Sequence, residues 1–237
     1  MGGQTFENTR SMTKEEYDDW LNNFKIKTSL IEGVDYVMPF RLKNKTKYSD
    51  VDFIVYDTDK FTDDIHKFTV TKEEKKIMLF EGRFNSYSIH VLTEDNIQID
   101  LLRPWAKESC EITRIYYSYS CANIFLKKLV SAREGFVLSY LGLLCIDNKC
   151  VLPSDSSIVK IESTTRLITS PKLLFDIIDL DYDRFVAGFD DEYQLLEYFK
   201  TSKYYDKIHF INNSKFKHDC KRLESFNNLF IAGLLNM

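Results

Sequence analysis

The chain has 237 residues, of which 44% are hydrophobic and 14% aromatic, and its formal net charge at pH 7 is −4. This composition is typical of one globular domain or of two small subdomains with a shared core, and the charge excludes a uniformly basic nucleic-acid-binding protein. No apolar stretch approaches the roughly 18 residues of a membrane-spanning helix, so we expect no membrane association.

The first predicted element is a helix that begins at Thr13. Thr13 can cap this helix, Glu16 stands at capping-box spacing, and an apolar stripe follows at Tyr17, Trp20, Leu21 and Phe24. Tyr36–Met38 predicts a short strand, and Val51–Tyr56 predicts a clear one. Between these strands lies a basic loop, Arg41–Lys47.

Further along the chain, strands and helices alternate. Tyr87–Leu92 and Ile97–Leu102 predict two strands joined as a hairpin at Glu94–Asn96. A helix is predicted over Cys121–Arg133 with Gly135 as its C-cap, and a second hairpin over 136–160 with its turn at Asp147-Asn148. Further helices are predicted from Pro171 through Ile178 and from Asp190 to Phe199. The pattern predicts an α+β fold with two parts, residues 1–110 and 111–237.

Three aspartates combine with these strands in an unusual way. Asp50 and Asp52 project from one face of their strand, and Asp100 shares a face with Gln98. If the two strands are neighbours, the carboxylates converge, and their repulsion amounts to several kcal/mol at an effective dielectric of about 20. Such a cluster calls for Mg²⁺ or Mn²⁺, and two ions about 4 Å apart would activate an attacking hydroxyl and stabilise leaving pyrophosphate. The alternative interpretation is an Asp-x-Asp pair exposed on a strand without function.

Ser49–Val55 followed by Ile97–Leu102 resembles the palm signature of the DNA polymerase β nucleotidyltransferase superfamily. The resemblance implies that Asp50 and Asp52 bind both metals. It also implies that Asp100 binds the catalytic metal and accepts the proton of the primer hydroxyl. The implied fold is a nucleotidyltransferase palm, with a mixed β-sheet and flanking helices, followed by a small C-terminal α+β subdomain that covers the nucleotide.

Downstream segments are similar to the family X DNA polymerases. Tyr116–Ser120 and the helix ending in Ala132–Phe136 resemble the segment that senses the nucleotide sugar and the helix that covers the nascent base pair. Leu152–Ser156 and Ser170–Asp176 resemble the last subdomain of that family. The residues before the palm are too few for the family's N-terminal lyase domain, so lyase activity is not implied.

The resemblance and the basic loop together give a set of candidate ligand-binding residues. Met38–Arg41 stands where the family has the Gly-Ser that grips the triphosphate, so we expect cationic side chains to replace it. The expected nucleotide-binding residues are Arg41, Lys43, Ser49, Tyr116, Tyr117, Ser118 and Asn123; those expected to contact nucleic acid are Lys45, Lys47 and Arg103. The tyrosines of Tyr116–Tyr119 either stack on a base or sugar or are half-buried strand residues, and Arg103 reaches either a phosphate or the neighbouring carboxylates. Tyr119 replaces the family's Gly, so the choice between ribose and deoxyribose is not implied.

The sequence predicts transfer of a nucleoside monophosphate from an NTP or dNTP to a nucleic-acid 3′-hydroxyl by a monomeric enzyme that uses two Mg²⁺ or Mn²⁺ ions. One alternative is a nucleotidyltransferase that modifies tRNA or a protein. Another is a catalytically inactive module that binds nucleotide or nucleic acid. The five cysteines include no C-x-x-C pair and no secretory segment is apparent, so we expect reduced thiols in an intracellular protein. The abundance of Lys, Asn, Ile, Tyr and Phe is compatible with viral or phage origin.

Overall fold

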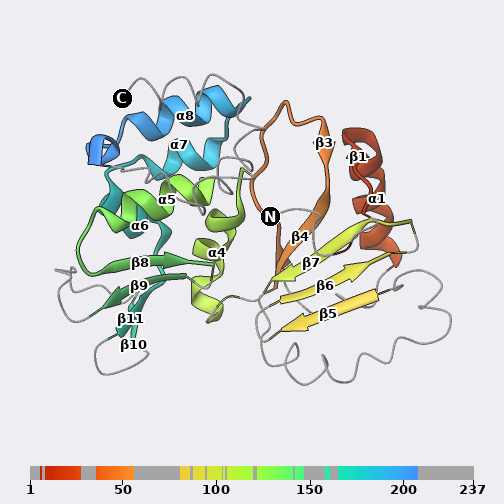
Figure 1. Ribbon diagram of the computed structural model, residues 1–237, viewed down its shortest axis with the longest axis horizontal. Coiled ribbons are helices and arrows are strands. Elements are labelled where there is room, and N and C mark those ends of the chain that lie inside the picture. Colours follow the sequence, from red (N-terminus) through yellow and green to blue (C-terminus); the bar gives the residue numbers. More distant parts are fainter. Residues whose placement is uncertain are drawn as a thin grey trace.

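The structure is a computed structural model that describes residues 6, 9–27, 36–55, 81–85, 88–93, 95–102, 104, 106–119, 122–140, 142–146, 158–160 and 165–207. It contains α-helices and β-sheets in two groups that lie side by side (Figure 1). One group carries the sheet of β2 and β4–β7, and the other carries the sheet of β8–β11 with most of the helices. The expected α+β class is therefore confirmed at the level of mixed helices and sheets.

The first group contains the N-terminal elements of the chain. They are β1 (Met12–Thr13), α1 (Lys14–Lys27), β2 (Tyr36–Val37), β3 (Lys47–Tyr48), β4 (Asp50–Val55), β5 (Glu81–Asn85), β6 (Ser88–Leu92) and β7 (Gln98–Leu102). The predicted capping box holds α1 in place, because Glu16 N–H donates to Thr13 Oγ1 (3.2 Å) and Thr13 N–H donates to Glu16 Oε2 (2.8 Å).

Five strands of this group form a mixed sheet in the order β2-β4-β7-β6-β5. β4 and β7 run parallel, and the remaining neighbours are antiparallel. Alternate residues of β4 and β7, Val51, Phe53 and Ile99, face α1. They form an apolar cluster with residues of β1, α1 and β3 and with the residue before β7: Met12, Tyr17, Tyr48 and Ile97. The polar residues of the same two strands consequently face the opposite side of the sheet.

The second group contains the later elements. They are η1 (Lys107–Ser109), α4 (Cys110–Tyr117), α5 (Ala122–Ser131), β8 (Phe136–Ser139), β9 (Gly142–Ile146), β10 (Ile158–Lys160), β11 (Thr165–Ile168), α6 (Pro171–Ile178), α7 (Tyr182–Ala187), α8 (Glu192–Lys200) and η2 (Tyr205–Lys207). Its four strands are antiparallel in the order β10-β11-β9-β8. Side-chain caps begin three of its helices: Ser170 for α6, Asp181 for α7 and Asp191 for α8.

Helix α4 and the segment 38–44 join the two groups. α4 contacts β4 on one side and β9 on the other. Arg114 of α4 donates to the carbonyl of Met38 (2.8 Å) and lies 3.9 Å above the ring of Phe40. Further along the segment, the amide of Lys43 donates to the carbonyl of Phe189 (3.0 Å). The segment that carries Arg41 is thus fastened to the second group while its chain continues into the first sheet.

Several predicted elements are confirmed with shifted ends. The hairpin of β6 and β7, the helix α5, the helix α6 with Pro171 at its first turn, and the helix α8 all form. The division of the chain near residue 110 stays a prediction. Among the described helices, none is long and apolar enough to cross a membrane.

One of the two alternatives for the tyrosines and two expectations are wrong. The alternative of half-buried strand residues does not hold for Tyr116 and Tyr117, which end helix α4. The second hairpin turns between Ser139 and Gly142, where Gly142 adopts a φ of 143°, and β9 pairs with β8 and β11 rather than with β10. Cys145 is disulfide-bonded, so the expectation of reduced thiols does not hold for this residue. Asp147-Asn148 and Leu152–Ser156 lie outside the described residues.

Candidate metal centre

The parallel pairing of β4 with β7 brings the three predicted aspartates together. Asp50 is opposite Gln98 in the register of the two strands, and Asp52 is opposite Asp100. Because side chains alternate along a strand, all three carboxylates leave the same face of the sheet, away from α1. The expectation that the two strands are neighbours is confirmed.

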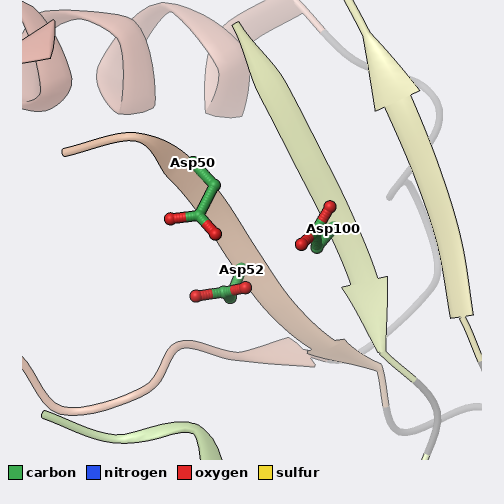
Figure 2. A group of neighbouring side chains, drawn as sticks. All are labelled: Asp50, Asp52 and Asp100. Atoms are coloured by element: carbon green, nitrogen blue, oxygen red, sulfur yellow. The ribbon is translucent and has the colours of Figure 1, made fainter. Parts of the chain in front are cut away.

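The three carboxylates turn toward one another (Figure 2). One carboxylate oxygen of each of Asp50, Asp52 and Asp100 lies within 4.8 Å of the others, and all three residues are buried. This separation suits ligands that share one cation or a close pair of cations. The acidic cluster is therefore a compact, desolvated feature and not a set of scattered surface charges.

Each carboxylate has a different partner on one of its oxygens. Ser49 Oγ donates to Asp50 Oδ1 (3.3 Å), and Arg41 Nη2 donates to Asp52 Oδ2 (2.8 Å). Asp100 Oδ1 is 2.8 Å from His90 Nδ1 and also accepts a 2.8 Å hydrogen bond from Gln98 Nε2. Within the described part of the chain, the second oxygen of each carboxylate accepts no hydrogen bond.

The crowding of these charges changes their proton affinities. Burial, together with the negative charge of Asp52, raises the pKa of Asp50 to about 7. Burial also raises the pKa of Asp100, although the hydrogen bond from His90 opposes that shift. Burial alone would lower the pKa of Arg41, but Asp52, Tyr17 and Asp50 together outweigh it and the pKa rises. A bound cation would offset the burial and the repulsion that keep a proton on Asp50.

The donor set fits a hard divalent cation. It consists of the carboxylate oxygens of Asp50, Asp52 and Asp100, which are ligands that Mg²⁺ and Mn²⁺ prefer. One oxygen of each aspartate has no hydrogen-bond partner among the described residues and remains for coordination. Mg²⁺ keeps several of its waters, so three protein oxygens are enough.

The other cations of the predicted set lie in different settings. Arg41 is largely buried against the carboxylates, with a side chain that is 15% exposed. Lys43 is exposed and pairs with Asp190 (3.3 Å). Lys45 lies 4.9 Å above the ring of Tyr48, and Lys47 is exposed at the start of β3. The structure therefore brings Arg41 to the centre and leaves the three lysines along the approach to β4.

Of the residues predicted from the sugar-sensing segment, one also lies near the carboxylates and the others lie away from them. Tyr117 is close enough for Asp52 and Asp100 to help raise its pKa, after burial and Tyr116. Tyr116 is buried in the second group, where Lys127 lies 4.9 Å above its ring. Ser118 is fully buried, with its hydroxyl bonded to backbone groups of Phe40 and Arg114. Asn123 is half-buried on α5, and Arg103 lies outside the described residues.

Sequence reasoning missed His90 and Gln98 as partners of Asp100. His90 has no metal-ligand spacing to the other histidines, so the spacing of the histidines did not indicate a role for it. The predicted hairpin did contain the information: a turn centred on Asp95 places residue 90 opposite residue 100, and the structure has this pairing.

No protein-family model matches this chain, and no curated protein matches it at a significant level.

Proposed function

We propose that the chain is a metal-dependent nucleotidyltransferase that adds a nucleoside monophosphate from an NTP or dNTP to a nucleic-acid 3′-hydroxyl. The observation that carries the proposal is the convergence of three buried carboxylates from two adjacent parallel strands. Burying three carboxylates costs free energy unless cations compensate their charge. A buried cluster of this kind is therefore expected at a cation-binding site. The resemblance of the two strand motifs to the polymerase β superfamily supports the same activity.

In this proposal, Asp50 and Asp52 hold two Mg²⁺ ions and Asp100 holds one of them. The ions would supply an activated hydroxyl and charge neutralisation for the phosphates. Asp100 would accept the proton of the attacking hydroxyl. Arg41 and Lys43 would bind phosphate oxygens of the incoming nucleotide. For Arg41 this requires that its guanidinium exchange Asp52 for a phosphate, because the two are paired at 2.8 Å.

The test is incubation with Mg²⁺ or Mn²⁺, each labelled NTP and dNTP, and a panel of primers, duplexes, RNAs and tRNA, with transfer to the protein itself also followed. Asp100→Asn is expected to lower turnover by a factor of about a thousand or more while nucleotide binding in Ca²⁺ hardly changes, because the carboxylate acts mainly in the transition state. Asp183→Asn, the same change on the exposed side of α7, is the matched control. An Asp100→Asn protein with more than a tenth of normal turnover would contradict the assignment.

One observation favours a second candidate, a catalytically inactive binding module. Arg41 already neutralises Asp52, and the usual Gly-Ser phosphate grip is absent from Met38–Arg41. A module of this kind would bind nucleotide equally well with EDTA and with Mg²⁺, whereas the enzyme requires the metal. Nucleotide binding measured in both conditions separates the two functions.

A further inference from the structure

His90 lies next to the metal centre but belongs to neither predicted motif. It occupies the third position of β6, directly opposite Asp100 in the antiparallel pairing with β7. Side chains at directly opposed positions share a face of the sheet and lie within reach of each other. The contact between His90 Nδ1 and Asp100 Oδ1 (2.8 Å) therefore follows from the strand register itself.

Gln98 donates a hydrogen bond to the same oxygen. It is two residues before Asp100 on β7, is fully buried, and donates from Nε2 to Asp100 Oδ1 (2.8 Å). A carboxylate oxygen accepts hydrogen bonds, so the ring nitrogen of His90 that faces it is a donor. Two donors thus converge on one oxygen of Asp100, while Oδ2 accepts no hydrogen bond within the described chain.

Two hydrogen bonds to one oxygen restrict the rotation of the Asp100 carboxylate about its terminal torsion. The terminal torsion of an aspartate is broad and nearly two-fold, so an unrestrained carboxylate exchanges its two oxygens at little cost. With Oδ1 fixed, the carboxylate plane and the direction of Oδ2 are set before any cation arrives. Outer partners of this kind orient the ligands of a metal site, and their loss typically lowers metal affinity by about 10- to 100-fold.

We propose that His90, acting together with Gln98, is the positioning residue of the metal centre and presents Asp100 Oδ2 as the ligand. The proposal rests on the function proposed above, since it gives Asp100 its role as a metal ligand. In this role His90 acts through the orientation of one carboxylate and is not itself a ligand of the metal.

The experiment titrates the full chain with Mn²⁺ alone and follows the free ion by electron paramagnetic resonance. His90→Leu replaces the donor ring by an apolar side chain of similar size. It is expected to raise the Mn²⁺ dissociation constant by about tenfold or more. His90→Asn is the matched rescue variant, because its amide nitrogen stands near the place of Nδ1; we expect its affinity within about threefold of the wild type. Circular dichroism melting checks that each variant folds, and His90→Ala serves in place of the Leu variant if that one does not fold.

The outcomes separate the inference from the proposed function. Wild-type affinity in His90→Leu, or equal losses in the Leu and Asn variants, would overturn the positioning role while the metal centre stands. A wild-type chain that binds no Mn²⁺ would overturn both. Rescue by His90→Asn together with a loss in His90→Leu supports the role, because a purely structural effect of the ring would not follow the presence of a hydrogen-bond donor.

Discussion

The guanidinium of Arg41 is paired with Asp52 in the middle of the carboxylate cluster, Nη2 to Oδ2 at 2.8 Å. The two side chains are only 15% and 9% exposed, so solvent screens the interaction weakly. Removing one member of such a buried pair is strongly destabilising, because the other charge is then buried without a partner. Arg41 therefore does part of the work that a metal ion would do at the same carboxylates.

This relationship predicts how the stability of an Arg41 variant depends on metal. Arg41→Gln should lower the free energy of unfolding by roughly 3 kcal/mol in EDTA, because Asp52 loses its cation. With saturating Mg²⁺ the loss should shrink to less than about 1 kcal/mol, since binding to the folded state alone stabilises it by mass action. Urea unfolding in the two conditions measures this. Arg41→Lys, which keeps the charge, is the control; an equal loss with and without Mg²⁺ would mean that Arg41 is needed for packing alone.

A second prediction concerns pH. The pKa of Asp50 is raised to about 7, against about 3.9 in an unfolded chain, so between these values the native protein holds a proton that the unfolded chain has lost. Stability contributed by this group therefore falls as pH rises from about 4 to about 7 in the metal-free protein. Mg²⁺ competes with the same proton, so its stabilising effect should increase over that window and level off above it.

Unfolding at pH 5, 6, 7 and 8, with EDTA and with Mg²⁺, measures both effects. Asp50→Asn isolates the group, because the amide does not titrate. The difference in unfolding free energy between wild type and Asp50→Asn should change with pH in EDTA. A difference that is flat across the four pH values would show that Asp50 titrates near its ordinary range.

Much of the carboxylate geometry follows from local sequence. Alternation along Asp50–Val55 and Gln98–Leu102 puts the acids on one face and the apolar side chains on the other, and no long-range information is needed for that step. The caps of α1 and α6 are equally local, since Thr13 with Glu16 and Ser170 with Pro171 lie within one turn of each helix start. That β4 and β7 are neighbours was an assumption, supported by the resemblance of their motifs.

What sequence reasoning could not reach depends on contacts between distant segments. The sequence assigned Arg41 to nucleotide binding and did not predict its pairing with Asp52, because only the hydrogen bonds of its loop to α4 and to Phe189 turn the guanidinium toward that carboxylate. Helix α4 was missed because its tyrosines resembled a strand segment. The apolar face of this helix is buried only through its contacts with β4 and β9. Tertiary packing overrides weak local preference in both cases.

A third prediction concerns Ser118, which sequence reasoning assigned to nucleotide binding. Its hydroxyl accepts from the amide of Phe40 (2.9 Å) and donates to the carbonyl of Arg114 (2.7 Å), and the residue is fully buried. Ser118→Ala should lower the free energy of unfolding by about 1–3 kcal/mol, because the amide of Phe40 loses its partner. Nucleotide affinity in Ca²⁺ should stay within about twofold. A tenfold weaker nucleotide with unchanged stability would reverse the assignment. Thr201→Ala is the control: this exposed residue at the end of α8 uses its hydroxyl only to donate to the carbonyl of Tyr198 (2.7 Å), so no buried amide loses its partner.

The final prediction concerns the path of a nucleic-acid acceptor over the lysines that precede β4. Lys43 pairs with Asp190 and Lys45 lies over Tyr48, whereas Lys47 is exposed and forms no ion pair among the described residues. Of these three lysines, Lys47 is therefore the one most available to a phosphate.

Lys47→Ala should weaken single-stranded oligonucleotide binding and reduce the slope of log K against log salt by about 0.7, the value of one phosphate contact on a single strand. Lys43→Ala should have a smaller effect, and Lys200→Ala, paired with Glu197 on α8, should have none. Fluorescence anisotropy at several KCl concentrations gives the slopes. An unchanged slope in Lys47→Ala would mean that the acceptor does not pass over β3, and a protein or small-molecule acceptor would then be favoured.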